Sequence, residues 1–249
     1  MEKKVFLLIQ GHTIFCDAVL ENVKNVENVI WSTDDDAPVE HQEKIKNSNV
    51  VLLTTPRPNH RGYGNVNVQI GTTMKGLELA KSLGATHVIK LRSDLIFTDP
   101  KRFIDTYNFD DRIHQLAYCK HTPLCINITN HYPELMSWVE NNYPNLVLDT
   151  SDYNYICDFT NLGPIEEMLL FWSLPYEPQD VHIPAEFKIV LRYLKLKGYK
   201  DVKLSYEWFS EIFGFYISYC KDANNTLTSL KRGWTTNDLL NSVDVKWVG

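Results

Sequence analysis

Residues 87–97 read His-Val-Ile-Lys-Leu-Arg-Ser-Asp-Leu-Ile-Phe, and this stretch says most about how the chain folds. The apolar run 88–91 is short and rich in aliphatic side chains, which predicts a buried strand. A polar corner made of Arg92, Ser93 and Asp94 follows directly. In open α/β sheets the carboxyl ends of the strands hold phosphate-bearing ligands and their metals. Asp94 is therefore the first candidate for a functional residue.

Upstream of this stretch, short apolar runs alternate with longer amphipathic segments. That alternation is typical of βαβ units and predicts an α/β fold with a mainly parallel sheet. A helix is expected from Asn65 to Ser82, because its apolar residues recur at helical spacing and Gly84 can cap its end. The expected strands are residues 5–9, 29–31, 50–53 and 88–91.

Downstream of residue 100 the pattern changes, and the expected helices start at prolines. One helix is expected after Pro164 and another after Pro184, with Gly198 closing the second. The stretch 226–236 is expected to be a loop that could serve as a lid. Neither a Ser/Gly-rich linker nor a repeat interrupts the chain, so we expect a single domain over residues 1–249 with one continuous sheet.

The composition is that of an ordered globular protein, with 249 residues of which 44% are hydrophobic and 12% aromatic. A formal net charge of -6 without a basic stripe argues against a nucleic-acid partner. The apolar run near the start, residues 5–9, is too short for a signal peptide or a membrane span, so a cytoplasmic protein without a transmembrane segment is expected. The five cysteines are widely spaced and predict reduced, mostly buried thiols.

Three loops are expected to meet at one edge of the sheet, where the first, second and fourth strands end. The first strand ends in Gln10 and Gly11, and the second leads to Asp34. A main-chain turn at Gly11 allows close approach of a nucleotide, and Asp34 can accept hydrogen bonds from a base or ribose. The next two residues, Asp35 and Asp36, are better interpreted as a solvated acidic turn.

Asp94 has two interpretations that the sequence leaves open. One strand-end carboxylate can help to hold Mg²⁺ or Mn²⁺ when phosphates and water supply the other ligands. Alternatively, Asp94 caps a turn or the following helix, which is a common role of Asp. Arg92 has the same side-chain direction if the strand continues, so it either contacts a phosphate or pairs with Asp94.

Two acidic residues of the second half are candidate catalytic bases. Asp158 lies on an apolar run before Pro164, where a buried carboxylate needs a partner or a purpose. Glu186 lies one turn into the helix begun by Pro184, where it either acts as a general base or interacts with the positive end of the helix.

Other polar residues are candidates for ligand contact. Asn67 and Gln69, near the start of the long helix, either contact a ligand or cap the helix. Lys231 and Arg232 can stabilise a diphosphate, or they form an ordinary exposed basic pair. The sequence has neither a phosphate-binding P-loop motif nor a complete dinucleotide fingerprint, which removes support for P-loop hydrolases and Rossmann dehydrogenases.

Several short motifs follow one another between about residues 5 and 194. They are Ile9-Gln10-Gly11, Asn65-x-Asn67-x-Gln69-Ile70 with Gly76-Leu77, Lys90-x-Arg92-Ser93-Asp94, Asp158 to Gly163, and Ala185-Glu186-Phe187. In this order and spacing the chain resembles the WavE family. That family is associated with lipopolysaccharide synthesis and is similar to GT-A nucleotide-sugar glycosyltransferases, with related sequences in large viruses.

The resemblance implies a GT-A-like three-layer α/β/α sandwich with a mainly parallel central sheet. It places Arg92-Ser93-Asp94 where most GT-A enzymes carry D-x-D, so only Asp94 matches a carboxylate that binds Mn²⁺ or Mg²⁺. Val68 departs from the family as well, since an arginine is expected at that position of the helix.

The function that the resemblance implies is a glycosyltransferase of polysaccharide biosynthesis. It would move a sugar from a nucleotide-diphosphate donor to a glycan, lipid-linked or protein-linked acceptor, and peripheral contact with a membrane is compatible with that role. Residues 1–100 would bind the nucleotide sugar and 101–249 the acceptor. The alternative is a non-catalytic nucleotide-sugar or glycan-binding module with the same fold.

The implied roles are as follows. Asp94 would hold the metal, and either Asp158 or Glu186 would deprotonate the acceptor in an inverting reaction. The donor would be bound by Gln10, Gly11, Asp34, Asn67, Gln69, Arg92, Lys231 and Arg232.

Overall fold

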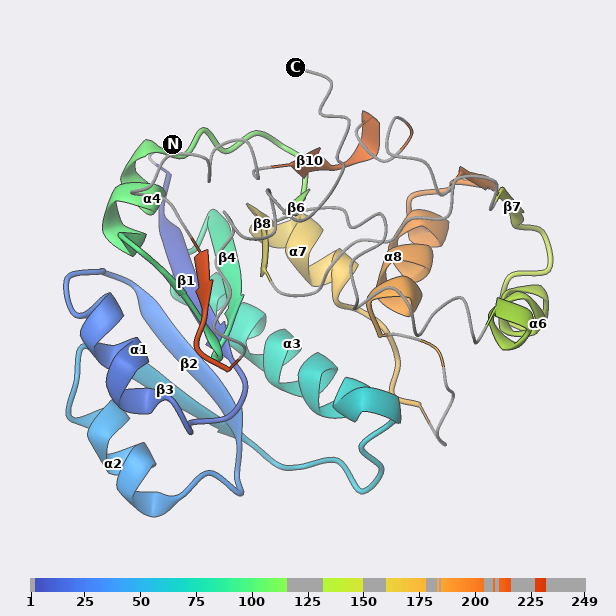
Figure 1. Cartoon of the computed structure of the whole chain (residues 1–249). Coiled ribbons are helices and arrows are strands. Elements are labelled where there is room, and N and C mark those ends of the chain that lie inside the picture. The colour runs from blue at the N-terminus through green and yellow to red at the C-terminus, as the bar shows by residue number, and fades with distance from the viewer. Residues whose placement is uncertain are drawn as a thin grey trace.

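The structure is a computed structural model, and it describes residues 3–115, 132–149, 160–177, 183, 185–203, 208, 211–215 and 227–231. Its centre is a seven-stranded sheet in the order β10-β6-β8-β4-β1-β2-β3 (Figure 1). The strands are β1 (Val5–Gln10), β2 (Val29–Asp34), β3 (Val50–Thr55), β4 (His87–Arg92), β6 (His114–Gln115), β8 (Thr160–Pro164) and β10 (Gly214–Phe215).

The central sheet is mainly parallel. β1 pairs in parallel with both β2 and β4, and β2 pairs in parallel with β3. Within the described part of this sheet only β8 runs against the others, antiparallel to β4 on one side and to β6 on the other. Strands from both halves of the chain therefore lie in the same sheet.

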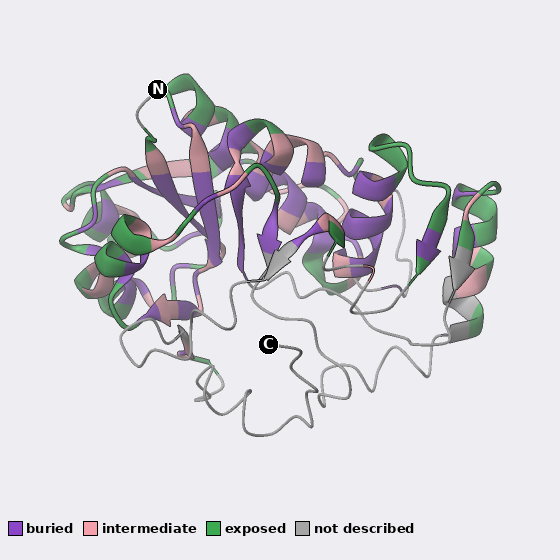
Figure 2. Ribbon diagram, turned by 90° about the horizontal axis from the view of Figure 1, so that it is seen from above, coloured by how far each residue is buried: buried purple, intermediate pink, exposed green. Residues whose placement is uncertain are grey.

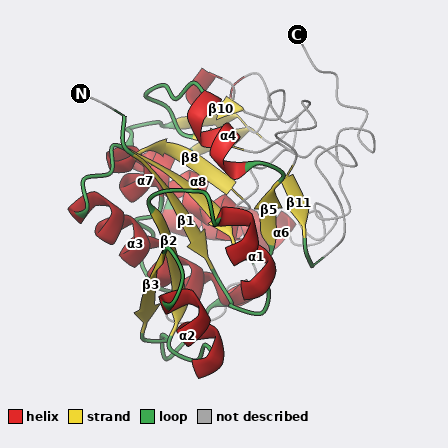
Figure 3. Cartoon of the chain, turned by 90° about the vertical axis from the view of Figure 1, so that its left-hand side faces the viewer, coloured by secondary structure: helices red, strands yellow, loops and turns green. Residues whose placement is uncertain are grey.

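Helices cover both faces of the sheet, which gives three layers (Figure 3). One face carries α1 (Cys16–Val23), α2 (Val39–Lys46) and α4 (Pro100–Thr106). The other carries α3 (Val66–Ser82), α7 (Ile165–Phe171) and α8 (Ala185–Leu196). The predicted fold class, an α/β sandwich with a mainly parallel central sheet, is confirmed.

The strands separate two hydrophobic cores because successive side chains point to opposite faces. In β1, Phe6 and Leu8 belong to the core under α3, whereas Leu7 and Ile9 belong to the core under α1. Figure 2 shows the central strands buried along most of their length and the exposed residues on the outer sides of the helices. Burial on both faces explains why these strands read as continuous apolar runs.

The strands and the long helix predicted for the first hundred residues are confirmed, with small differences at their ends. α3 follows a short 3₁₀ turn, η1 (Tyr63–Asn65), and its carboxyl end is capped as expected by Gly84, whose φ is +86°. Gly84 N donates to Lys81 O, and the following Ala85 N donates to Ala80 O, both at 2.9 Å. These two bonds form the Schellman motif that glycine favours.

In the second half, the helices expected after Pro164 and Pro184 are present as α7 and α8, and Gly198 closes α8 with φ +86°. The remaining elements are α6 (Tyr132–Asn142), β5 (Leu95–Phe97), β7 (Val147–Asp149), β9 (Asp201–Lys203) and β11 (Leu227–Ser229). The predicted loop over 226–236 is wrong at 227–229. These residues form β11, because β5 offers them an antiparallel partner that is distant in the sequence.

The described part of the chain contains no helix that is both long and apolar enough to cross a membrane. Cys16 is buried in the core under α1, and this burial raises the pKa of its thiol. The other four cysteines, Cys119, Cys125, Cys157 and Cys220, lie outside the described residues.

Candidate functional site

The ends of β1, β2 and β4 meet at one edge of the sheet, as predicted. β1 lies between the other two strands, and hydrogen bonds join the turns that follow them. Gly11 N donates to Ser32 O at 3.1 Å, and Ser93 N donates to Gln10 O at 2.9 Å. The chain continues from β1 to β2 on one side and returns through α3 to β4 on the other, so this edge is a topological switch point.

A cavity of about 360 Å³ opens at this edge. Its walls come from the three strand ends, the start of α3 and Lys231. The predicted ligand-binding residues that line it are Gln10, Gly11, Asp34, Gln69, Arg92, Asp94 and Lys231. Seven of the predicted residues therefore share this cavity, although their roles stay predictions.

Gly11 makes the close packing at the cavity floor possible. Its φ is +125°, in the region that favours glycine, and a Cβ at this position would lie 2.7 Å from Ser93 Oγ. Trp31 Nε1 donates to Gly11 O at 3.3 Å and holds the turn from the other side. The backbone at Gly11 thus faces the cavity without an intervening side chain.

Arg92 and Asp94 form a two-pronged ion pair at the cavity wall. Arg92 Nε donates to Asp94 Oδ1 at 3.0 Å, and Arg92 NH2 donates to Asp94 Oδ2 at 2.8 Å. Both side chains are largely buried, with 24% and 14% of their surfaces exposed. Of the two interpretations of Arg92, the structure shows the one in which it pairs with Asp94. Parallel bonds of this kind fix the guanidinium plane as well as its position.

This ion pair bears on the predicted metal site. A divalent cation held by one protein carboxylate needs oxygen lone pairs directed toward it. Both oxygens of Asp94 accept hydrogen bonds from Arg92, whose charge also repels a cation at that carboxylate. Over the described ranges, no group of three or more His, Cys, Asp or Glu side chains is placed to hold a metal. The hydrogen bonds and the charge of Arg92 therefore disfavour Mn²⁺ or Mg²⁺ at Asp94.

Asp34 is buried at the opposite side of Gly11 and is paired with Arg57. Arg57 Nε and NH2 both donate to Asp34 Oδ2, at 3.0 and 2.7 Å, so Oδ1 is the oxygen left for a ligand. The exposed Asp36 also forms an ion pair with Arg57. The backbone N–H of Arg57 donates to Asp35 Oδ1 at 3.1 Å. Sequence reasoning missed the role of Arg57. The available signal was its place just after β3, the strand beside β2.

Gln10 is held by α3. Its Nε2 donates to Thr72 Oγ1 at 3.1 Å, and Ser32 Oγ donates to Thr72 O at 2.7 Å. Thr72 also lines the cavity and was missed, although it lies one turn after Val68 on the same helix face. Gln69 Oε1 is buried and receives no hydrogen bond in the described structure.

Asn67 does not line the cavity, although it was predicted to bind a ligand. It is almost fully buried, and its amide joins two distant segments. Nδ2 donates to His60 O at 2.9 Å and to Glu177 O at 2.8 Å, while Oδ1 accepts from Glu177 N at 2.7 Å. These contacts give Asn67 a structural position.

The remaining predicted residues differ in where they lie relative to the cavity. Lys231 reaches the cavity because β11 pairs with β5, and Leu230 N donates to Asp94 O at 2.8 Å. Glu186 lies in the first turn of α8 and does not line the cavity. Asp158 and Arg232 lie outside the described residues.

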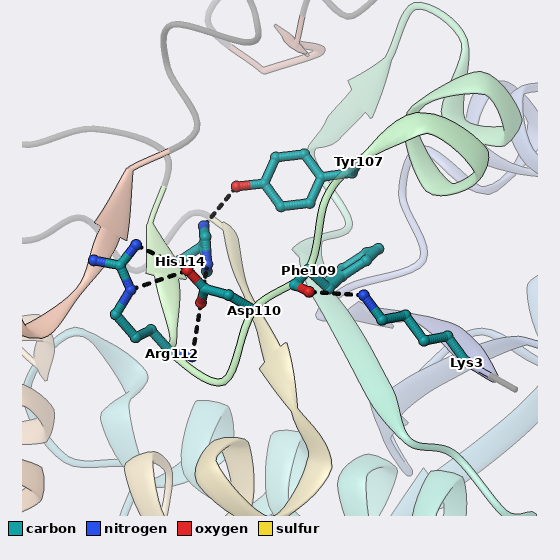
Figure 4. A network of polar contacts seen from close by, with 6 residues as sticks. All are labelled: Lys3, Tyr107, Phe109, Asp110, Arg112 and His114. Carbon is teal, nitrogen blue, oxygen red and sulfur yellow. Dashed lines mark hydrogen bonds and ion pairs between the residues drawn. The ribbon is translucent and has the colours of Figure 1, made fainter. Parts of the chain in front are cut away.

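A separate polar network connects α4 to β6, away from this cavity (Figure 4). Tyr107 OH is 2.6 Å from His114 Nδ1, and His114 Nε2 is 2.7 Å from Asp110 Oδ1. Burial raises the pKa of Asp110, but hydrogen bonds from Arg112 and His114 outweigh it and hold that pKa well below its ordinary value. Sequence reasoning did not identify this network.

Solved structures that resemble the chain share little of its sequence. No model of a protein family matches the chain, and no curated protein matches it. One similar solved structure, from Bacillus anthracis and in complex with sucrose, is assigned as a glucose-1-phosphate thymidylyltransferase; it shares 11% identity over 98% of both chains, with a TM-score of 0.44. Another, a cytidylyltransferase from Leptospira borgpetersenii, shares 12% identity over 81% of this chain and 76% of that one, with a TM-score of 0.37. Likenesses this weak support no statement about family or reaction.

Proposed function

We propose that the chain is a glycosyltransferase that binds a nucleotide-diphosphate sugar in the cavity between β1 and β4. The observation that carries this proposal is the position of the cavity at the switch point of an open α/β sheet, where such folds bind nucleotides. Its volume, about 360 Å³, lies within the usual range for small-molecule sites.

The distribution of charge along the cavity suits a nucleotide. Asp34 ends β2 and Arg92 ends β4, with β1 between them. Strands lie about 4.8 Å apart, so the two side chains start from points separated by roughly 10 Å. That span matches the distance from a base or ribose to a diphosphate. Asp34 would accept hydrogen bonds from the nucleoside, and the cations near β4 would meet the diphosphate.

The proposed reaction is direct displacement at the anomeric carbon of the donor sugar. The acceptor oxygen forms a new bond to that carbon, the bond to the diphosphate oxygen breaks, and the diphosphate leaves with both electrons. A carboxylate takes the acceptor proton, and Asp158 and Glu186 are the candidates. The resemblance noted in the sequence also implies Mn²⁺ or Mg²⁺ bound to Asp94. The ion pair between Arg92 and Asp94 disfavours a metal at that carboxylate.

Calorimetric titration with UDP-, GDP- and CMP-sugars tests the donor site, and release of free nucleotide with mixed glycan acceptors tests the reaction. Asp34→Asn is expected to weaken donor binding by at least about tenfold, or 1.4 kcal/mol, because the buried acceptor loses its charge. Asp105→Asn, on the exposed side of α4, is the matched control. Failure of every nucleotide sugar to bind would exclude the proposed donor site.

A non-catalytic nucleotide-sugar-binding module is the second candidate. It is favoured by the position of Glu186 away from the cavity and by the pairing of both lining carboxylates with arginines. Tight donor binding without nucleotide release, across a broad acceptor mixture, would favour the module over the enzyme.

A further inference from the structure

We infer that Arg92 and Lys231 together neutralise the diphosphate of the ligand, so that binding needs no divalent cation. Asp94 is then a positioning residue that holds the Arg92 guanidinium at the cavity wall. This inference rests on the proposed function and assigns the recognition of the diphosphate within the same cavity.

The charged side chains that line the cavity are two carboxylates, Asp34 and Asp94, and two cations, Arg92 and Lys231. Asp34 is paired with Arg57, which does not line the cavity and also forms an ion pair with the exposed Asp36. Asp94 is neutralised by Arg92. Lys231 is exposed, and no described residue forms an ion pair or hydrogen bond with it. At the β4 side of the cavity, where Arg92 and Asp94 balance each other, Lys231 therefore adds one positive charge that an arriving diphosphate meets.

Arg92 is suited to this role because its orientation is fixed in advance. Two hydrogen bonds to Asp94 hold the guanidinium plane, and only 24% of the side chain is exposed. A partly buried cation interacts with phosphate in a medium of lower effective dielectric than water. A planar guanidinium also matches phosphate geometry better than a lysine does. A fixed cation loses little conformational freedom when the ligand binds.

Lys231 is brought to the same place by strand pairing. Ser229 is opposite Leu95 in the β11–β5 ladder, and Leu230 N donates to Asp94 O. Lys231 follows Leu230 and lines the same cavity as Ser93. Ser93 is the residue whose Oγ lies against Gly11. Lys231 and the backbone turn at Gly11 therefore line the same cavity.

Calorimetric titration of the full chain with UDP, GDP and CDP, and with the matching monophosphates, tests the inference. Each titration is run in EDTA and again with Mn²⁺ or Mg²⁺. We expect one nucleoside diphosphate to bind with dissociation constants that agree within about twofold in the two conditions. Lys231→Met is expected to weaken diphosphate binding by about tenfold and monophosphate binding by less than about threefold. Lys46→Met, at an exposed lysine of α2 outside the cavity, is the matched control.

Asp94→Asn separates the two roles of this residue. If Asp94 holds a metal, this substitution removes only the diphosphate binding that depends on Mn²⁺ or Mg²⁺. If Asp94 positions Arg92, the substitution is expected to weaken diphosphate binding by about threefold to tenfold, and equally in EDTA and with the metal. Arg92→Gln leaves Asp94 without its partner and can unfold the chain, so the double variant Arg92→Gln/Asp94→Asn is the second test. It keeps a neutral pair of similar shape, and it is expected to bind diphosphate and monophosphate equally weakly while its melting temperature stays close to that of wild type.

The outcomes are distinguishable. Binding that requires Mn²⁺ or Mg²⁺ and disappears in Asp94→Asn would overturn the inference and leave the proposed donor site in place. Binding of no nucleotide in any condition would overturn both. Equal affinity of Lys231→Met and Lys46→Met for the diphosphate would also refute the role of Lys231.

Discussion

Gly11, in the turn after β1, lies against Ser93 in the turn after β4, so the close packing at the cavity depends on the absence of a Cβ at Gly11. Gly11→Ala is expected to lower the free energy of unfolding by about 1–3 kcal/mol, because φ is +125° and the new Cβ would overlap Ser93 Oγ. Nucleotide binding should fall as well, since the shifted turn narrows the cavity. Chemical denaturation and calorimetry measure the two effects.

Gly198→Ala is the control for Gly11→Ala. Gly198 also has positive φ, +86°, but no atom lies within 4 Å of the point that a Cβ would occupy there. Gly198→Ala should lower the free energy of unfolding by about 1 kcal/mol and leave nucleotide binding unchanged. The double variant Gly11→Ala/Ser93→Gly should recover the part of the loss that comes from steric overlap. Equal stability of the two alanine variants would show that Ser93 does not constrain Gly11.

At the residue scale, the sequence predicted seven of the residues that line the cavity, but it left open whether Arg92 pairs with Asp94 and did not predict the partner of Asp34. Asp34 and Asp94 could be placed at strand ends from local patterns alone. The pairing of Asp34 with Arg57 joins the ends of two strands 23 positions apart in the sequence, and the choice of Arg92 to bind Asp94 depends on side-chain rotamers. The structural contacts of Asn67 could not be predicted either, because its partner Glu177 lies 110 positions away in the sequence.

Among the elements, β11 has the largest effect on the cavity for its length. Leu230 and Asp94 form a hydrogen-bonded pair, so the alternation of an antiparallel ladder makes Thr228 and Ile96 the next such pair. Thr228→Pro removes that donor and is expected to release Lys231. Diphosphate affinity should fall about tenfold, as in Lys231→Met.

Melting temperature and calorimetry together test this prediction. The midpoint of Thr228→Pro should drop by less than about 4 °C, because β11 is outside the central sheet. Thr228→Ala keeps the backbone donor and is the matched control. If Thr228→Pro binds diphosphate as wild type does, the ladder does not position Lys231.

The segment between α4 and β6 is stabilised by the ionised form of Asp110, which makes its contribution dependent on pH. The pKa of Asp110 is lower in the folded than in the unfolded chain. Its contribution is therefore present above the unfolded value, about 3.9, and is lost as the pH falls through the folded value. Asp110→Asn should cost about 1 kcal/mol at pH 7, allowing for solvent screening, and progressively less below about pH 4.

Urea denaturation at pH 7, 5 and 3 checks the sign of this effect. The exposed neighbour Asp111 supplies the control, and Asp111→Asn should change the free energy of unfolding by less than about 0.5 kcal/mol. A cost of Asp110→Asn that grows toward acid pH would contradict the assigned direction of the pKa.

Local periodicity explains which elements were predictable. The strands of the first hundred residues are buried on both faces, and α3 carries one apolar stripe and a glycine cap, so each has a local signature. β11 and the antiparallel direction of β8 have none, because both depend on partners that are distant in the sequence. The expected loop over 226–236 was wrong at 227–229 for that reason.

At the scale of the molecule, Glu177 ties the two halves together. Its backbone is held by the Asn67 amide of α3, and its carboxylate forms a buried ion pair with Lys188 of α8. Asn67→Ala leaves partly buried backbone groups of His60 and Glu177 without these partners. A fully buried group that loses its partner costs about 1–3 kcal/mol, so a total loss of about 2–4 kcal/mol is expected for these partly buried groups.

Urea denaturation followed by circular dichroism and by tryptophan fluorescence measures the effect of Asn67→Ala. Both signals should shift together, because Trp31 and Trp172 are buried in cores on opposite faces of one sheet. Asn25→Ala, at an exposed position, should change stability by less than about 0.5 kcal/mol. Two separate transitions in the Asn67 variant would show that the halves unfold independently.

The pairing of β11 with β5 also sets when the cavity is completed during translation. Positions 94 and 229 are 135 residues apart, which corresponds to roughly 7 to 27 seconds at usual rates of synthesis. Throughout this interval the ends of β1, β2 and β4 are already made, but β5 has an unpaired edge and the rim lacks Lys231. A nascent chain stalled before residue 227 would therefore carry the carboxylates of the cavity without its second cation, and an open strand edge that other chains can join.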